Sequence, residues 1–222
     1  MKTTLCHVCC CIAAALITAF PLASCTTDAY DKGNNDYSML EAEMADIHVG
    51  KDLKADYLTT DDGKHLAITF PFTSNWMKTP DSTYRAMTYF TRNNAGVEVA
   101  AVNRVAVTMP RPMDDLKTDP VRFESLWVSS NGIYLNTCIY MMVGTTDDEN
   151  AIQTLGCQKD SIRNNSDGTT TQLLTLYHDQ GGVPEYYSRR TYISIPLYGI
   201  NTDSLCLSVN TYKGIRTYSV PR

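Results

Sequence analysis

Apolar and polar residues alternate along most of the chain with the period of two that is typical of half-buried β-strands. Leu205, Leu207 and Val209, for example, share one face of a predicted strand, and the residues between them are small or polar. No segment sustains the longer apolar period of a helix. We therefore expect an all-β protein.

The first half of the chain predicts short strands that are separated by turn residues. Asp61-Asp62-Gly63 is a strong hairpin signal between two of them, and residues 72–83 are expected to form a long loop. The expected strands are residues 39–49, 57–60, 65–70, 84–92 and 97–109. Five strands in about seventy residues suit a small barrel of the OB type, which we assign to residues 37–109.

Prolines interrupt this pattern near the middle of the chain. Pro110 and Pro112 open a stretch that is poor in apolar residues, so residues 110–119 are interpreted as a linker. Seven candidate strands follow: residues 121–128, 133–143, 151–161, 169–178, 190–197, 204–212 and 216–220. Their number and regular spacing predict an antiparallel β-sandwich over residues 120–222.

The first 24 residues have a different character. Lys2 is their single charged residue, and an almost wholly apolar stretch follows it, as in a secretory signal peptide. The end of this stretch, Leu22-Ala23-Ser24-Cys25, resembles the lipobox of bacterial lipoproteins, in which the cysteine is acylated. We expect removal of residues 1–24 and a membrane anchor through lipid on Cys25. Cleavage without lipidation is the alternative.

The residues after Cys25 bear on location. By resemblance to other lipoproteins, an aspartate at the position of Thr26 would favour retention in the inner membrane, so we expect the outer membrane. Residues 25–36 are predicted to form a flexible polar tether. The tether is mildly acidic, as in some surface-exported lipoproteins, so the periplasmic face and the cell surface both remain open.

The net charge of the chain limits the classes of partner that it is expected to bind. Removal of the signal peptide leaves 18 basic and 24 acidic residues, a formal charge of −6. A nucleic-acid partner would require a basic surface, so we expect none. The same charge opposes electrostatic attachment to anionic lipid, which leaves anchoring to the acyl chains.

Few cysteines remain for a disulfide once the signal peptide is removed. Four of the eight lie within residues 1–24, and Cys25 is expected to carry lipid. Cys138, Cys157 and Cys206 remain, so one disulfide at most can form within the chain. Cys138 with Cys206 is the favoured pair, and buried free thiols are the alternative.

No catalytic or metal motif is present in the sequence. His48, His65 and His178 do not occur at metal-ligand spacings. The chain has no Gly-x-Ser-x-Gly and no phosphate-binding glycine loop ahead of a helix. We therefore expect neither enzymatic activity, nor a metal, nor a cofactor.

Aromatic residues are the candidates for binding. Trp76 lies in a predicted loop, and Tyr186 and Tyr187 lie beside a glycine-rich turn. Exposed aromatic side chains stack on sugars and anchor protein partners. These three are our candidate ligand-binding residues, with cover of the barrel mouth and of sheet faces as the alternative. Trp127 lies between Leu126 and Val128 and is expected in the sandwich core.

Several of these segments resemble the NigD-like lipoproteins. The resemblance is carried by the run from Asp119 to Val128, by Tyr134-Leu135-Asn136, by Leu176 to Asp179 and by Ile193 to Leu197, with Asp61-Asp62-Gly63 in the first half. It implies a lipid anchor, an N-terminal OB-like barrel and a C-terminal β-sandwich. It supplies no functional residue beyond the lipidated cysteine.

Together these observations predict a non-catalytic, outer-membrane lipoprotein that binds an envelope or extracellular protein partner. The NigD-like resemblance links that role to bacteriocin production or immunity. A cell-surface carbohydrate-binding module is the alternative function.

Overall fold

The computed structural model describes residues 40–222, which form one compact unit. The expectations for the signal peptide, Cys25 and the tether at residues 25–36 lie outside the described residues. In the part that is described, no helix is long and apolar enough to cross a membrane. Every regular element of this part is a strand, which confirms the all-β prediction.

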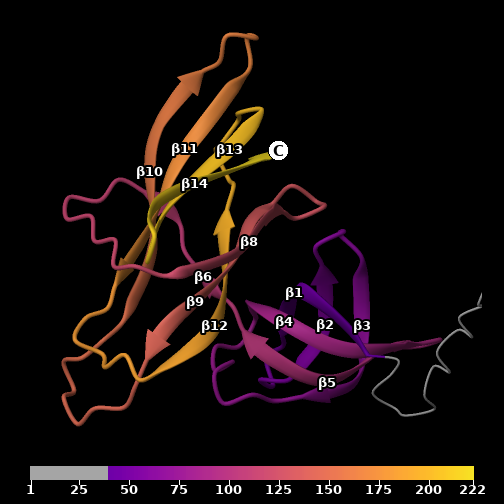
Figure 1. The fold of residues 1–222 in the computed structure, drawn as a ribbon. Helices are drawn as coiled ribbons and strands as arrows, with labels where there is room; N and C mark the ends of the chain where they lie inside the picture. Colours follow the sequence, from indigo (N-terminus) through magenta and orange to yellow (C-terminus); the bar gives the residue numbers. More distant parts are fainter. Residues whose placement is uncertain (1–39) are drawn as a thin grey trace, which may run out of the picture. The chain divides into compact units, whose positions relative to one another are not determined.

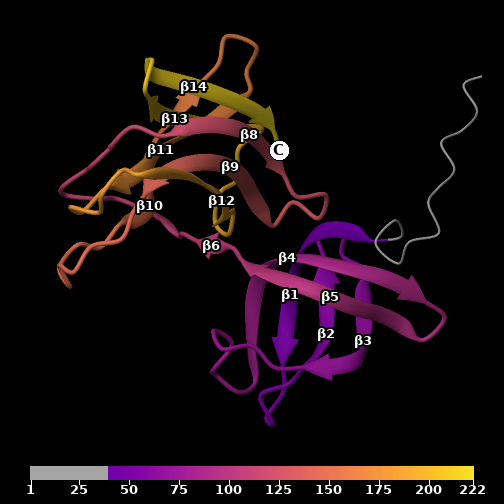
Figure 2. The same cartoon turned by 60° about the horizontal axis from the view of Figure 1, so that its bottom comes forward.

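The first five strands close into a barrel in the order β1-β2-β3-β5-β4 (Figure 2). They are β1 (Glu41–Val49), β2 (Ala55–Thr60), β3 (His65–Phe72), β4 (Ser82–Asn93) and β5 (Gly96–Arg104). Closure depends on a parallel contact between β3 and β5, where Ile68 pairs with Val97. Gly96 has a φ of +147°, and a Cβ there would collide with the carbonyl oxygen of Ala67. A glycine is therefore required where the two strands meet.

The remaining strands form two sheets (Figure 1). The four-stranded sheet has the order β6 (Ala106–Val107), β12 (Tyr187–Pro196), β9 (Tyr134–Val143) and β8 (Arg122–Val128). The five-stranded sheet has the order β14 (Gly214–Pro221), β13 (Ser204–Thr211), β11 (Thr170–Asp179), β10 (Thr154–Asn164) and β7 (Pro110–Arg111).

Each part has its own apolar core. Apolar residues of alternate positions face inward, as the strand period requires. The barrel core contains Ala45, Ile47, Leu58, Ala86, Phe90 and Val97. The sandwich core contains Leu135, Ile139, Ile193 and Ile195 from one sheet, and Leu174, Leu176, Leu205 and Leu207 from the other.

The connection from the barrel supplies an edge strand to each sheet. The expected strand at residues 97–109 ends at Arg104, and β6 and β7 follow as two-residue strands. β6 runs parallel to β12, and β7, inside the expected linker at residues 110–119, runs parallel to β10. The chain thus crosses from one sheet to the other along one side of the sandwich. β11 and β13 are also parallel neighbours.

Trp127 is not in the sandwich core, so that expectation is wrong. It packs against Met44, Met87 and Val105 in a separate cluster that joins the sheet to the barrel. The cause is a register shift in β8 between Phe123 and Ser125. A bulge of this kind moves later residues of a strand to the opposite face, so Leu126 and Val128 pack on the core in place of Trp127.

The three cysteines of the described part are buried free thiols, so the favoured pair, Cys138 with Cys206, does not form. Cys206 lies between Leu205 and Leu207, which point into the sandwich, and it therefore faces outward from the five-stranded sheet. Cys138 donates to a carboxylate oxygen of Glu124, at 3.1 Å, on the outer face of the four-stranded sheet. The two thiols are on opposite sides of the sandwich.

Thiol titration tests this assignment. Burial raises the pKa of Cys138 to about 11 and that of Cys157 to about 12, so both stay protonated at neutral pH. In a soluble form that begins at Thr26, we expect no reaction with a thiol reagent in the native state. Unfolding without reductant should expose all three thiols. Detection of one thiol would mean that a disulfide exists.

Candidate functional site

The three candidate aromatic residues fall into two separate places. Trp76, in the loop between β3 and β4, is half-buried against the barrel core and meets the ring of Tyr84 edge-on at 5.7 Å. Its ring therefore packs on the barrel core and is not fully exposed to solvent. Tyr186 and Tyr187 lie at the start of β12 in the sandwich, and 72% and 56% of their surfaces are exposed.

Tyr186 is held from the side of β9 although most of its ring is in solvent. Its backbone N–H donates to the carbonyl of Val143 at 3.1 Å. A Cβ on Gly144 would lie 2.6 Å from the carbonyl oxygen of Pro184 and 2.8 Å from the Tyr186 ring. The loops on either side are therefore in close contact, and a glycine is needed between them.

A second exposed apolar residue, Ile152, is fixed in the same way. The side chain is 65% exposed, and the backbone N–H donates to the carbonyl of Gly181 at 3.1 Å. Gly181 has a φ of +55°, and a Cβ there would collide with the carbonyl of Ile152. We call the loops at residues 144–153 and 180–186, together with Tyr187 at the start of β12, the loop platform. Its exposed side chains are Ile152, Tyr186 and Tyr187.

His178 lies beneath the platform and is 1% exposed. Its Nδ1 is 3.0 Å from the carbonyl oxygen of Asp119, so this nitrogen must carry a proton and donate it. Its Nε2 lies 3.0 Å from the side-chain amide nitrogen of Gln153. Both ring nitrogens are thus engaged in structural contacts, which leaves neither of them directed at a ligand.

Two glutamine side chains complete the buried hydrogen-bond network beneath the loop platform. The Gln153 amide is 2.8 Å from Gln180 Oε1, and both amides are within hydrogen-bond distance of the Met142 carbonyl. The Gln180 amide also donates to the carbonyl of Val183 at 2.8 Å, and the Gln180 backbone N–H donates to the Asp119 carboxylate at 2.6 Å. This network ties the end of β9 and the start of β10 to the loop after β11, so the platform is held in one arrangement before any partner arrives.

The acidic loop at residues 147–150 is part of the loop platform, and hydrogen bonds within the loop stabilise it. The Asp148 carboxylate accepts from the backbone N–H of Asn150 at 2.9 Å and from its side-chain amide at 3.1 Å. Among the residues with described positions, no three metal-ligating side chains converge. The other two histidines, His48 and His65, contact the ring of Tyr57 on the barrel, at 4.5 and 4.1 Å between centroids.

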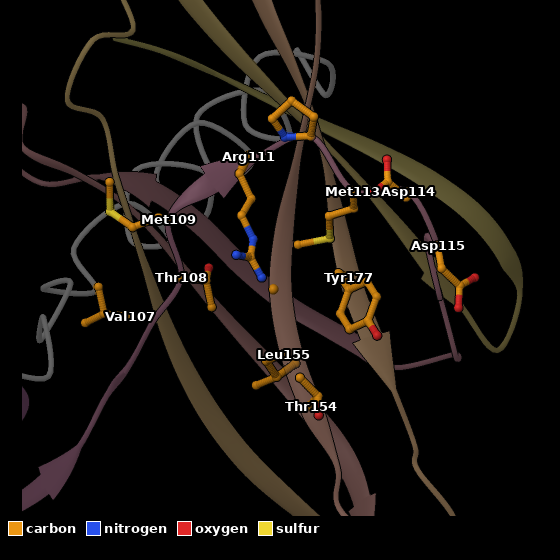
Figure 3. A pocket seen from close by; sticks show the side chains of 12 residues that line it. Val107, Thr108, Met109, Arg111, Met113, Asp114, Asp115, Thr154, Leu155 and Tyr177 are labelled. Atoms are coloured by element: carbon orange, nitrogen blue, oxygen red, sulfur yellow. The ribbon is translucent and has the colours of Figure 1, made fainter.

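Two adjoining grooves flank the segment that contains β6. The first has a volume of about 950 Å³, and Arg104 from the barrel, Arg189 and Arg190 from β12, and Gln153 line it. The second has a volume of about 700 Å³ and shares Val107, Thr108, Thr154 and Leu155 with the first. In Figure 3, the Met113 side chain of the second groove extends toward that of Arg111, and Asp115 points away from the guanidinium.

The barrel meets the sandwich through a buried arginine. The Arg85 side chain of β4 is 2% exposed and contacts Asp61 at 2.5 Å and Asp46 at 3.4 Å. Its guanidinium also lies 4.1 Å over the ring of Tyr134 in the sandwich. Burial raises the pKa of Asp46, because the charged form loses water, and burial raises the pKa of Tyr134 to about 12.

Two polar residues of the four-stranded sheet complete this junction. Asn136 donates to Asp61 at 2.8 Å, and Ser194 donates to Asn136 at 2.7 Å while it accepts from Arg85 Nε at 3.1 Å. We call Arg85, Asp46, Asp61, Asn136 and Ser194 the junction cluster. Sequence reasoning missed it, because a polar residue on the outer face of a strand is ordinary and nothing in the sequence marks its partner. Its part is to hold the two β regions together.

Comparisons with known proteins agree with this architecture. A family model described as the NigD-like C-terminal beta sandwich domain matches residues 105–222. No curated protein matches the chain significantly.

Solved structures show the same fold across most of the chain. A NigD-like immunity protein from Bacteroides caccae is 22% identical, with 81% of this chain and 91% of that one covered and a TM-score of 0.58. A candidate toxin-related protein from Parabacteroides distasonis is 17% identical, with 82% and 93% covered and a TM-score of 0.59. A candidate lipoprotein from Bacteroides fragilis is 13% identical, with 82% and 97% covered and a TM-score of 0.57. At these identities the likeness concerns the fold.

Proposed function

Because the chain belongs to the NigD-like family, we propose that it is a non-catalytic lipoprotein, anchored in the outer membrane through Cys25, which binds a protein partner through the loop platform. The partner is a protein of the envelope or of the extracellular space. The solved structures that this chain resembles include a NigD-like immunity protein and a candidate lipoprotein, which is in keeping with such a role.

The observation that carries the proposal is the rigid display of apolar side chains. Ile152, Tyr186 and Tyr187 are between 56% and 72% exposed, yet two glycine contacts and a buried amide network fix the loops beneath them. Exposed aromatic residues on a rigid base are the usual anchors of protein interfaces, because little conformational entropy is lost when they are buried.

Variant-dependent capture from intact cells tests this proposal. Cells that carry the tagged full-length protein are crosslinked gently, and the captured proteins are compared between wild type and the Tyr186→Ala and Tyr187→Ala variants. We expect one protein to be lost about tenfold or more from the Tyr186→Ala sample. Tyr198→Ala is the matched control, because Tyr198 is 91% exposed but lies in the turn after β12.

Two results would count against the proposal. One is a set of captured proteins that is the same for all four forms. The other is binding of a soluble glycan that Tyr186→Ala abolishes, which would favour the carbohydrate-binding module instead.

A further inference from the structure

Strand β12 has an open edge beside the platform. On one side it pairs with β9 from Tyr187 to Pro196, but on the other side only Ile193 and Ser194 pair with a strand, the two-residue β6. Within residues 40–222, no strand pairs with Tyr187 to Tyr192 on that side. Six residues of a ten-residue strand therefore present an unpaired edge.

The hydrogen-bonding groups of this edge can be assigned from β6. The N–H of Thr108 donates to the carbonyl of Ser194 at 3.1 Å, so Ser194 directs its backbone groups toward β6. Backbone groups point to the same side at every second residue of a strand. Tyr192 and Arg190 therefore present their N–H and carbonyl groups at the open edge, which is a template for a further strand.

Space for such a strand is present. The groove of about 950 Å³ lies between Arg189–Tyr192 of β12 and the barrel residues Tyr89, Asn103 and Arg104. The chain segment before β6 leaves the edge at Arg104 to enter the barrel. β6 itself shows that the edge of β12 accepts a strand.

The charge of the groove identifies the kind of segment that it fits. Arg104 and Arg189 are exposed, and among the described residues neither forms a salt bridge, whereas Arg190 is paired with Glu124 at 2.5 Å. Two uncompensated guanidinium groups face one groove in a chain whose formal charge is −5. Carboxylates would be attracted to this groove, and lysine-rich segments would be repelled.

We propose that this groove takes an extended acidic segment of the partner protein, which is added to the open edge of β12 as a strand. This inference rests on the proposed function. The main-chain ladder would supply affinity and the two arginines would select negative charge, as in other cases of strand addition. The segment would run along β12 to Tyr187, where the same strand enters the loop platform. An acidic glycan shares the charge but has no peptide main chain to extend the ladder.

A library of displayed random dodecapeptides provides the test, with the full-length protein in detergent micelles as bait. We expect the enriched peptides to be rich in Asp and Glu and poor in Pro. Their Kd should rise about tenfold or more for Arg104→Glu and Arg189→Glu. Arg216→Glu is the matched control, because Arg216 is exposed on β14, at the far edge of the five-stranded sheet. Hydrogen exchange of the complex should show new protection at the amides of Arg190 and Tyr192.

The outcomes separate this inference from the proposed function. Enriched peptides without acidic excess, equal binding to Arg189→Glu, or unchanged exchange at Arg190 would overturn strand addition. Binding of polygalacturonate that depends on Arg189, with no acidic peptide enriched, would overturn it in favour of a glycan. If cell capture depends on Tyr186 but not on Arg189, the proposed binding of the partner in the groove is wrong, and the proposed binding by the loop platform is retained.

Discussion

The Cys25→Ser variant should leave the membrane fraction completely. Serine cannot form the thioether to which the lipid is attached, and acyl chains contribute about 0.8 kcal/mol for each buried CH₂ group. The net negative charge of the chain gives no electrostatic hold on anionic lipid in their place. The measurement is incorporation of labelled palmitate, together with the distribution of the protein between membrane and soluble fractions.

A second substitution provides the control for location. Thr26→Asp keeps the acylated cysteine, so labelling should persist while the protein moves to the inner membrane. Palmitate in the Cys25→Ser variant, or continued membrane attachment without it, would show that another anchor exists.

The Arg85→Met variant should be strongly destabilised. Removal of the guanidinium leaves Asp46 and Asp61 as neighbouring carboxylates that are only 22% and 18% exposed, with no cation beside them. Loss of one partner from a buried ion pair typically lowers the free energy of unfolding by about 3–5 kcal/mol. The partial exposure of both carboxylates places the expectation near the lower figure. Urea unfolding of a soluble form measures it, and Trp127, which packs at the same junction, reports the change by fluorescence.

Matched variants separate this effect from ordinary loss of charge. Arg92→Met removes the salt bridges to Glu41 and Glu43. The side chains of the two glutamates are 41% and 36% exposed and that of Arg92 is 33% exposed, so stability should change by less than about 1 kcal/mol. Adding Asp46→Asn and Asp61→Asn to Arg85→Met should recover much of the loss, because neutral amides can stay buried with hydrogen bonds. If Arg85→Met destabilises the protein no more than Arg92→Met, the buried ion pairs do not hold the barrel to the sandwich.

Strand positions could be predicted from this sequence because each strand buries one face. The alternation of Leu205, Leu207 and Val209 with small or polar neighbours corresponds to β13, and Asp61-Asp62-Gly63 corresponds to the turn between β2 and β3. Patterns of this kind involve residues that are close together in the sequence, so they can be recognised without knowledge of the fold. The division into a barrel and a sandwich followed from the number of strands and from the family resemblance.

Contacts between distant parts of the chain were not predictable in the same way. Trp127 was misplaced because a bulge in β8 reverses the inward face, and the sequence around Phe123 carries no mark of it. Arg85 lies in an aromatic-rich strand, and its partners Asp61 and Asn136 are 24 and 51 residues away. His178 looked like the end of a strand, and only its neighbours Gln153 and Asp119 show that it supports the loops above it.

The two buried polar networks stabilise different regions of the protein. The junction cluster fixes the barrel against the outer face of the four-stranded sheet, and the network around His178 and Gln180 fixes the loop platform at one end of the sandwich. Rigidity of both kinds lowers the entropy lost on binding. Because the loops are fixed, the exposed tyrosines stay in solvent and do not pack onto the protein surface.

Site-specific photo-crosslinking in living cells tests the loop platform most directly. A photoreactive phenylalanine analogue replaces Tyr186 in one strain and Tyr198 in another, so that both probes are on exposed turns next to β12. We predict a light-dependent adduct with a single envelope or extracellular protein from position 186 and none from position 198. No adduct from position 186, or the same adducts from both positions, would contradict a binding role for the platform.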